Sequence, residues 1–550
     1  MRVKLGFVGR AKEPSARLRA SATRYGDVPA IRAAAGTALC SFTRRGRHTG
    51  SRLCPPYALA LAGLLLTLLV GVANAAKDTL VIDLVQEPSS LDPHVQWNPD
   101  SYFVYRNVFD NMLTRDNDGK IVPQVAASWR QVDDSTTEFT LRDDIRFHDG
   151  TQLTADDVVF SVKRITDPAF KSPQRDQFNK IVDAVAVSPT IVRLKTEGPY
   201  PVLHAQLTKL SIVPKAYVTQ AGNEKFNQSP IGSGPYKFVA IQRGVKTTLA
   251  RNDAYWGQKG AFATAEFHAV PDPATRVADL RSGKADLIVT INADLATELK
   301  NDPKVKVLSV LSERVAYFHL NSLTGPTADL KVRQAIAHAI DRQGIIDGLM
   351  HGYDKPATIM LAPVHVGYVD GFKGYAYDPA KAKALLKEAG IASQTPFTLF
   401  TAPTFDQRVV QAIQQMLIDV GLTVNITTSD FAGWLKRAQS SPAEFGEMTF
   451  SRWSCGCQDA DGVLFPLYHS SSQWAKSKDA AMDKELEAAR SVLDPAARLA
   501  HYRRVHEIAE ATVPLVPLYQ VAILYGARKE LRWTPTPNES FFINRVAWQD

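Results

Sequence analysis

Cysteine is scarce in this 550-residue chain, and its four cysteines are unevenly placed. Only Cys455 and Cys457 lie in the body of the chain, since the other two precede an apolar segment near its start. A Cys-x-Cys pair with His469 nearby in sequence is an incomplete ligand set for a structural zinc site. The sequence therefore predicts no metal site.

A net basic charge is also missing from the body of the chain. The formal charge of +8 belongs to the first 75 residues, which hold 12 Lys and Arg against 2 Asp and Glu. The remaining residues hold 52 basic against 54 acidic side chains. Without a basic surface, the composition gives no support for nucleic acid as a partner.

Catalytic and phosphate-binding patterns are absent as well. The glycine-rich turn at 231–238 lacks the GxGxxG and GxxxxGK[ST] spacings, and Pro235 removes an N–H that a phosphate cradle would use. No Ser-His-Asp order lies in a nucleophile-elbow context. We interpret His148 as the anchor of a strand and turn. The sequence therefore predicts a protein that is not an enzyme and has no cofactor.

Long apolar runs are confined to residues 58–72, which are too few to span a bilayer comfortably. Arg44, Arg45, Arg47 and Arg52 lie shortly before this run, and Ala73-Asn74-Ala75 follows it as a small-x-small cleavage site. We expect residues 1–75 to be a signal segment that directs a soluble chain out of the cytoplasm. The part before the apolar run is unusually long, so we expect translation to start downstream of Met1.

The stretch from Pro123 to Arg164 carries the clearest local pattern. Residues 138–142 alternate polar and apolar side chains, as a half-buried strand does, and Asp149-Gly150 supplies turn chemistry. Thr154 has Asp157 three residues later, the spacing of a capping box, ahead of an apolar helical face. This pattern predicts a strand, a turn and a capped helix.

The same stretch resembles a known signature. Its segments ASW, FTLR and FHDGTQLTADDVVFSVKR are similar to the signature of the family-5 extracellular solute-binding proteins of ABC importers. That family includes dipeptide-, oligopeptide-, nickel- and glutathione-binding types. Further matching blocks are LDPH at 91–94, GSGPYK at 232–237, RNDAYW at 251–256, VRQAIAHAIDR at 332–342 and PLVPLY at 514–519.

The resemblance implies an α/β fold of the type II periplasmic binding protein class. It implies two hinged α/β lobes, with an additional domain inserted in the first lobe. Ligand contacts both lobes only when they close, so binding shifts an open–closed equilibrium. The implied boundaries are 76–109, 233–318 and 526–550 for the first lobe, 110–232 for the inserted domain, and 319–525 for the second lobe.

Periodicity along the chain predicts the main elements of these lobes. Residues 267–291 have a strand, helix, strand pattern, which favours an α/β layer with parallel strands. Apolar residues at helical spacing predict helices at 102–113, 330–346, 378–390, 407–420, 482–492 and 496–511.

The candidate ligand-binding residues gather in residues 452–461, RWSCGCQDAD. In peptide-binding relatives, the Trp of this block is followed three residues later by an Asp that pairs with the ligand's α-amino group; here that position is Gly456. The longer spacing resembles the glutathione-binding branch and makes Asp461 the first candidate amine-binding carboxylate and Asp459 the second. The alternative is that both acids hold a loop through Asx turns.

Three other side chains complete the candidate site. Trp453 could stack on the ligand or belong to the core, and Arg452 lies beside it. Ser172-Pro173-Gln174 is similar to a Ser-Pro-Tyr segment whose Tyr touches peptide in oligopeptide-binding relatives. With Gln174 in that place, the resemblance favours a ligand other than a typical di- or oligopeptide.

Cys455 and Cys457 leave several readings open. Export to an oxidising compartment favours a disulfide if the geometry allows it, although one intervening residue makes a tight ring. A pair of buried thiols beside the cleft is the other structural reading. A redox function is a third, although the surrounding sequence is not thioredoxin-like.

Together these features predict the periplasmic solute-binding component of an ABC importer, with a small amine-bearing or short-peptide ligand. Permease subunits in the membrane would be its partners, and we expect a monomer. The alternative is an exported redox or chaperone-like protein that uses Cys455 and Cys457. A single sequence leaves the ligand itself open, because one fold serves many chemistries.

Overall fold

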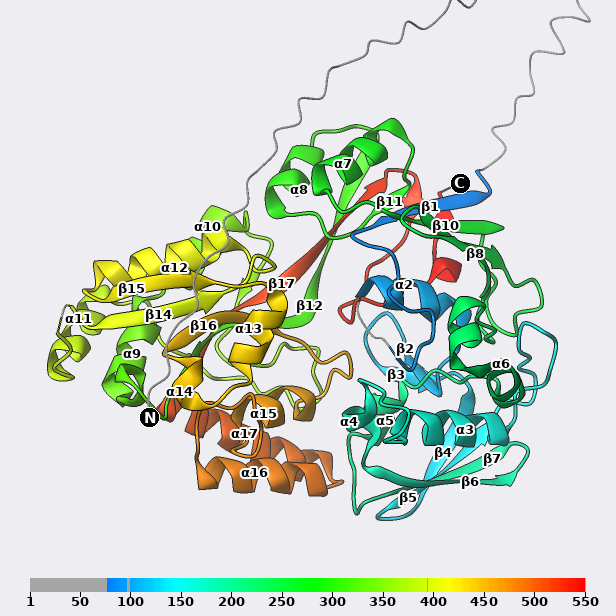
Figure 1. Cartoon of the computed structure of the whole chain (residues 1–550), viewed down its shortest axis with the longest axis horizontal. Helices are drawn as coiled ribbons and strands as arrows, with labels where there is room; N and C mark the ends of the chain where they lie inside the picture. Colours follow the sequence, from blue (N-terminus) through cyan, green and yellow to red (C-terminus); the bar gives the residue numbers. More distant parts are fainter. Residues whose placement is uncertain (1–76, 96–98, 393, 550) are drawn as a thin grey trace, which may run out of the picture. The chain divides into compact units, whose positions relative to one another are not determined.

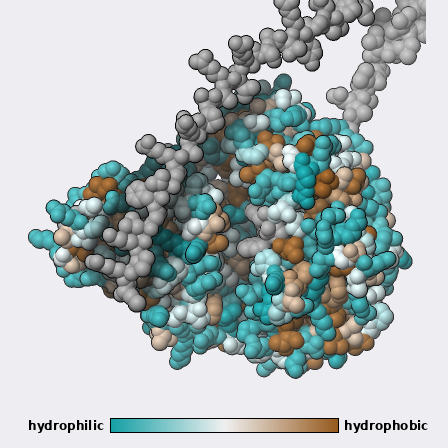
Figure 2. Space-filling view, in the orientation of Figure 1, coloured by the Kyte–Doolittle hydropathy of each residue, from teal (hydrophilic) through white to brown (hydrophobic). Residues whose placement is uncertain are grey.

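The computed structural model describes residues 77–95, 99–392 and 394–549, which belong to one compact unit. The predicted signal segment and its cleavage site lie outside the described residues. Within the described part, no helix is both long and apolar enough to cross a membrane. Hydrophilic and hydrophobic residues are interspersed over the face seen in Figure 2.

An eleven-stranded sheet runs through this unit in the order β15-β14-β16-β12-β17-β11-β1-β10-β9-β8, with β13 paired beside β17. Its centre is an antiparallel pair of long strands, β12 (Val305–Leu320) and β17 (Leu515–Arg528). One end of β17 pairs with β11, and the opposite end of β12 pairs with β16. The two long strands therefore connect two groups of strands (Figure 1).

The group that includes β1 (Thr79–Leu84) is called the first lobe. Here β1 pairs in parallel with β10 (Thr264–Ala269) and β11 (Leu287–Ile288), and α7 (Pro273–Ser282) makes the crossover that parallel strands need. The predicted strand, helix, strand pattern is thus confirmed. Its other elements are α2 (Pro99–Val108), β8 (Tyr236–Gln242), β9 (Lys246–Arg251), α8 (Ala293–Leu299), β18 (Leu531–Arg532), η2 (Ile543–Arg545) and β19 (Ala547–Trp548).

The group around β14 (Pro396–Thr401) is called the second lobe, and it has its own large apolar core. β14 pairs in parallel with β15 (Thr423–Thr428) and with β16 (Met448–Trp453). The other elements are η1 (Pro326–Ala328), α9 (Leu330–Ala339), α10 (Arg342–Leu349), β13 (Lys355–Pro356), α11 (Pro379–Glu388), α12 (Gln407–Asp419), α13 (Phe431–Ala438), α14 (Pro442–Phe445), α15 (Asp461–Tyr468), α16 (Ala480–Ser491) and α17 (Pro495–Thr512).

A separate antiparallel sheet, in the order β4-β5-β7-β6, marks a further domain that we call the four-stranded domain. Its core joins buried apolar residues between Met112 and Ile212. The elements of this region are β2 (Leu113–Arg115), β3 (Ile121–Pro123), β4 (Ala126–Asp133), β5 (Thr136–Leu141), α3 (Ala155–Thr166), α4 (Arg175–Phe178), β6 (Ile181–Ser188), β7 (Ile191–Thr196), α5 (Leu203–Leu207) and α6 (Lys215–Gln228). The residue-by-residue domain boundaries stay a prediction.

The signature blocks meet in three dimensions. The Thr154 N–H donates to the Asp157 carboxylate at 2.9 Å, which confirms the capping box at the start of α3. The His148 ring accepts from the Gly232 N–H at 3.3 Å, and its Nε2 donates to the Gly234 carbonyl at 3.0 Å. This confirms His148 as an anchor, because its two ring nitrogens hold the glycine-rich turn.

Two helix predictions need correction. A single helix over 330–346 is wrong: α9 ends at Ala339 and α10 begins at Arg342. The break follows from Asp341, whose carboxylate accepts the Gly344 N–H at 2.8 Å and caps a new helix. The helix expected at 102–113 ends at Val108, because the chain goes on to pair as β2.

Candidate ligand-binding cleft

A cavity of about 380 Å³ lies where the two long strands pass between the lobes. The first lobe contributes Asp100, Asn292 and Ala293, the second contributes Asp354, Arg408 and Arg452, and β12 and β17 supply Arg314, Tyr519 and Ala522 between them. Because its walls come from both lobes, this cavity is the place where closure of the lobes would enclose a solute. We call it the cleft.

A bulge in β12 shapes one wall of the cleft. The pairing of β12 with β17 shifts register between Leu311 and Val315. Ser312 stabilises the irregularity, since its Oγ donates to the Val521 carbonyl at 2.7 Å and its own carbonyl accepts from Gln520 Nε2 at 2.7 Å. A bulge re-aims the side chains that it carries, here Glu313 and Arg314.

Most charges in the cleft are already paired. Arg314 donates twice to Glu539, at 2.6 and 3.1 Å, and this neighbour raises the pKa of the guanidinium. Arg408 reaches Asp406 at 2.8 Å and Asp294 of the first lobe at 2.6 Å. The Arg408–Asp294 pair joins the two lobes, but both side chains are exposed, so it is worth only about 0–1 kcal/mol.

Arg452 differs from the other arginines of the cleft. Among the described residues, no carboxylate lies within 4.0 Å of its guanidinium, and its polar contact is a long one, 3.4 Å from Nη2 to the Thr404 carbonyl. Asp354 lies on the same wall, where it accepts the Ala522 N–H at 2.6 Å, and burial raises its pKa to about 6. The cleft therefore offers an unneutralised cation beside a buried carboxyl group.

Two of the sequence-predicted residues line this region. Arg452 lines the cleft itself, and Gln174 lines a smaller adjoining cavity. Gln174 Nε2 also donates to the Pro93 carbonyl at 2.6 Å, so its amide is held in place by the LDPH block. Their contact with a ligand stays a prediction.

Asp459 and Asp461 lie together, but outside the lining of both cavities. Asp459 receives a bidentate ion pair from Arg498, at 2.6 and 2.8 Å, and accepts the Asp461 N–H at 2.9 Å. Asp461 is ion-paired with Arg490 Nε at 2.9 Å, and burial raises its pKa to about 6. Asp459 therefore holds the loop through an Asx turn, whereas Asp461 is held by its ion pair with Arg490, and a direct role of either acid in amine binding stays a prediction.

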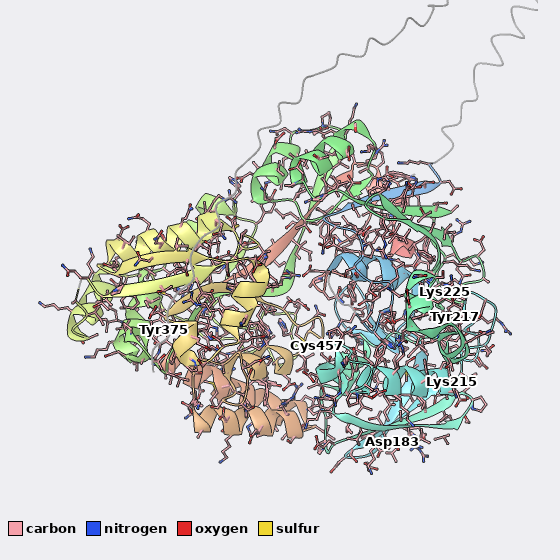
Figure 3. The ribbon with its side chains drawn as sticks, viewed as in Figure 1. Asp183, Lys215, Tyr217, Lys225, Tyr375 and Cys457 are labelled. Atoms are coloured by element: carbon pink, nitrogen blue, oxygen red, sulfur yellow. A yellow bond between two sulfur atoms is a disulfide. The ribbon has the colours of Figure 1, made fainter. Side chains whose placement is uncertain are left out.

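The aromatic and sulfur residues of the same loop have structural contacts. The Trp453 indole N–H donates to the Gly462 carbonyl at 3.0 Å, and the ring packs edge-on against Trp474. Cys455 and Cys457 form a disulfide. Cys457, labelled in Figure 3, packs with the apolar core of the four-stranded domain, and Arg115 of that domain donates to its carbonyl oxygen. The loop therefore ties the second lobe to the four-stranded domain.

Sequence reasoning missed several acidic residues in and beside the cleft: Asp354 and Glu539 line the cleft, and Glu313 lines the smaller adjoining cavity. Their identities carry no motif, and they come from three separate segments of the chain.

Two α/β lobes joined by long crossing strands around a cleft define the type II periplasmic binding protein class, as the sequence predicted. The chain belongs to the bacterial extracellular solute-binding proteins, family 5, whose middle-region profile matches residues 120–475. Members of this family are the solute-binding components of ABC importers.

Known relatives agree with this assignment over most of the chain. The glutathione-binding protein GsiB of Escherichia coli K12 is 27% identical over 491 residues, covering 86% of this chain and 94% of that protein. DppA from Helicobacter pylori, solved in complex with the peptide STSA, is 27% identical with a TM-score of 0.75, covering 86% and 98%. CtaP from Listeria monocytogenes, 24% identical with a TM-score of 0.80 and coverage of 86% and 100%, shows the shared fold alone.

Proposed function

We propose that this chain captures a zwitterionic, peptide-like solute in the cleft and delivers it unchanged to the permease subunits of its importer. The observation that carries the proposal is Arg452, a cation of the cleft without a carboxylate partner among the described residues. A guanidinium forms two parallel hydrogen bonds with a carboxylate, so Arg452 suits the carboxylate end of such a solute. GsiB is named for binding glutathione and DppA was solved with a peptide, and both ligands carry this group.

The position of the cleft between the two lobes also supports a mechanism for delivery to the permease. Residues from both lobes line it, so a solute that touches both walls binds the closed arrangement better than the open one. The permease then needs to recognise only the closed arrangement. A micromolar dissociation constant, about −8 kcal/mol, would suffice to populate that arrangement.

The proposal also covers export of the chain, its oligomeric state and release of the solute. We infer that the first 75 residues direct export to the periplasm, where the mature chain works as a monomer. We also infer that the bound solute is released without chemical change. Mass spectrometry of the mature secreted chain would locate the cleavage, which we expect after Ala75.

Calorimetric titration of the mature chain with peptides, glutathione and sugars tests the proposal. We expect saturable binding of at least one carboxylate-bearing solute, recovered unaltered after release. Arg452→Gln should weaken that binding about 10- to 100-fold, because the carboxylate loses a charge-assisted bidentate pair. Arg504→Gln, on the exposed face of α17, is the matched control and should bind as the parent does. Equal binding by both variants would contradict the assignment of Arg452.

A further inference from the structure

A second, smaller cavity of about 80 Å³ adjoins the cleft and shares Arg314 and Glu539 with it. Four further segments converge on it: α2, the four-stranded domain, the bulge of β12 and the disulfide loop. Tyr102 and Tyr105 come from α2, and Gln174 and Lys209 come from the four-stranded domain. Glu313 comes from the bulge, and Ser454 and Gly456 come from the disulfide loop. We call it the side cavity.

Glu313 is the unusual residue of the side cavity. It is 4% exposed, and its Oε2 atom is buried without a hydrogen-bond partner among the described residues. No Lys, Arg or His nitrogen of that part of the chain lies within 4.0 Å of its carboxylate, whereas Glu539 nearby has Arg314 at 2.6 Å. A buried carboxyl group without a cationic partner is costly to ionise, so its position at the wall of a cavity indicates that a donor from outside the chain binds there.

Gly456 leaves the space in front of Glu313 open. A Cβ atom at this position would lie 3.9 Å from Glu313 Oε1 and 4.0 Å from the Cε atom of Lys209. Any side chain longer than that of alanine would compete for the space between them. The disulfide joins the residues on either side of Gly456 and fixes this part of the loop beside the cavity.

We propose that Glu313 is the carboxylate that receives the cationic amino group of the solute, in the side cavity beside Gly456. The proposal rests on the function proposed above and adds the group that selects for an amine. The side cavity has room for an ammonium group, so the remainder of the solute, with its carboxylate near Arg452, occupies the larger cleft. A primary amine joined to a carboxylate through a short chain is therefore the class of ligand that fits.

The electrostatics of the side cavity agree with this geometry. Burial raises the pKa of Glu313 to about 8; Glu539 acts in the same direction, and Arg314, Lys209 and Arg115 oppose it. Burial also lowers the pKa of Lys209 to about 8. At pH 7 the Glu313 carboxyl group is therefore largely protonated, and an arriving ammonium group would drive its proton into solution. We expect binding to release up to one proton and to strengthen, by up to tenfold per unit, as the pH rises toward 8.

The test compares glutathione and trialanine with their N-acetylated forms, titrated into the parent chain, Glu313→Gln and the exposed control Glu224→Gln. For the parent and the control, we expect acetylation of the amine to weaken binding at least 30-fold. Glu313→Gln should bind the free amine more weakly than the parent does, by a similar factor. Acetylation of the amine should not weaken binding to this variant any further. Titration in buffers of different ionisation enthalpy should show proton release for the parent but not for Glu313→Gln.

The outcomes separate this proposal from the function on which it rests. If Glu313→Gln binds the free amine as tightly as the parent does, the role of Glu313 is overturned while solute capture stands. The same conclusion follows if acetylation still weakens binding to Glu313→Gln. If the parent binds neither probe in either form, the peptide-like ligand class and the amine site fall together. Thermal unfolding of Glu313→Gln checks that the variant is folded, and removal of a buried group that is costly to ionise should leave it at least as stable as the parent.

Discussion

Two sets of buried acids lie close to the cleft, and they differ in how their charge is compensated. In the disulfide loop, Asp459 has Arg498 and Asp461 has Arg490. In the bulge of β12, Glu313 has no cation within ion-pair distance among the described residues. Compensated carboxylates stabilise a loop, whereas an uncompensated one at a cavity is available to a ligand. Partners, rather than residue type, therefore distinguish the structural acids from the proposed binding acid.

The largest expected effect on stability comes from removing the cation that compensates Asp459. Arg498→Met should lower the free energy of unfolding by about 3–5 kcal/mol, because it leaves Asp459 buried and unpaired. Urea unfolding followed by circular dichroism measures the change. Arg504→Ala, on the same helix but in an exposed pair with Glu507, should cost about 0–1 kcal/mol. Equal losses in the two variants would remove the distinction between the two sets of acids.

Removal of the uncompensated acid, Glu313, should raise stability, in contrast to Arg498→Met, and the gain should depend on pH. The folded pKa of Glu313 is raised above its unfolded value, so the folded state binds the proton more tightly and the parent loses stability as the pH rises from about 4 to 8. Glu313→Gln should therefore be more stable than the parent at pH 8.5, on the order of 2 kcal/mol, with a smaller difference at pH 5. Unfolding curves at the two pH values measure it. A variant that is less stable at pH 8.5 would show that Glu313 is compensated after all.

The disulfide tests whether the loop acts as a support or as a reactive site. Cys455→Ser with Cys457→Ser should cost about 1–2 kcal/mol, since the closed loop is very short. Solute affinity should stay within about threefold, because neither sulfur atom lines the cleft. Calorimetry of the double variant gives both quantities. Loss of every measurable activity would instead favour the exported redox protein.

The smallest expected effect concerns Trp453. Trp453→Phe keeps an aromatic ring against Trp474 but leaves the Gly462 carbonyl without its donor, which should cost about 1 kcal/mol. Solute affinity should change little if the ring is a support for the loop. A loss of affinity of tenfold or more would show that Trp453 touches the ligand.

The fold was largely predictable because its signals are local. The Thr154 capping box, the Asp149-Gly150 turn and the apolar spacing of residues 407–420 each act over a few residues or helical turns, and the structure contains all three. The matching blocks extended these local signals to a family. The break between α9 and α10 was missed because Asp341 could equally be an exposed residue on one continuous helix, and only the cap that it forms shows otherwise.

The candidate site was predictable only in part. Arg452 and Gln174 were named from the resemblance, and they line the cleft and the side cavity. Glu313, Asp354 and Glu539 could not be found in the same way, because their significance lies in what surrounds each carboxylate. Burial and partner distances are properties of the folded chain and leave no pattern in the neighbouring letters.

The amino-acid order by itself determined the class of protein, since hydrophobic periodicity, caps and turns act over short distances and the blocks that resemble the family extend over most of the chain. Only the tertiary structure decided which charges are satisfied. Glu313 in the bulge of β12 and Gly456 in the disulfide loop lie close together only after folding. The same is true of Asp459 and Asp461 and the two arginines that pair with them. The low dielectric around each carboxylate then sets the free energy of its ionisation.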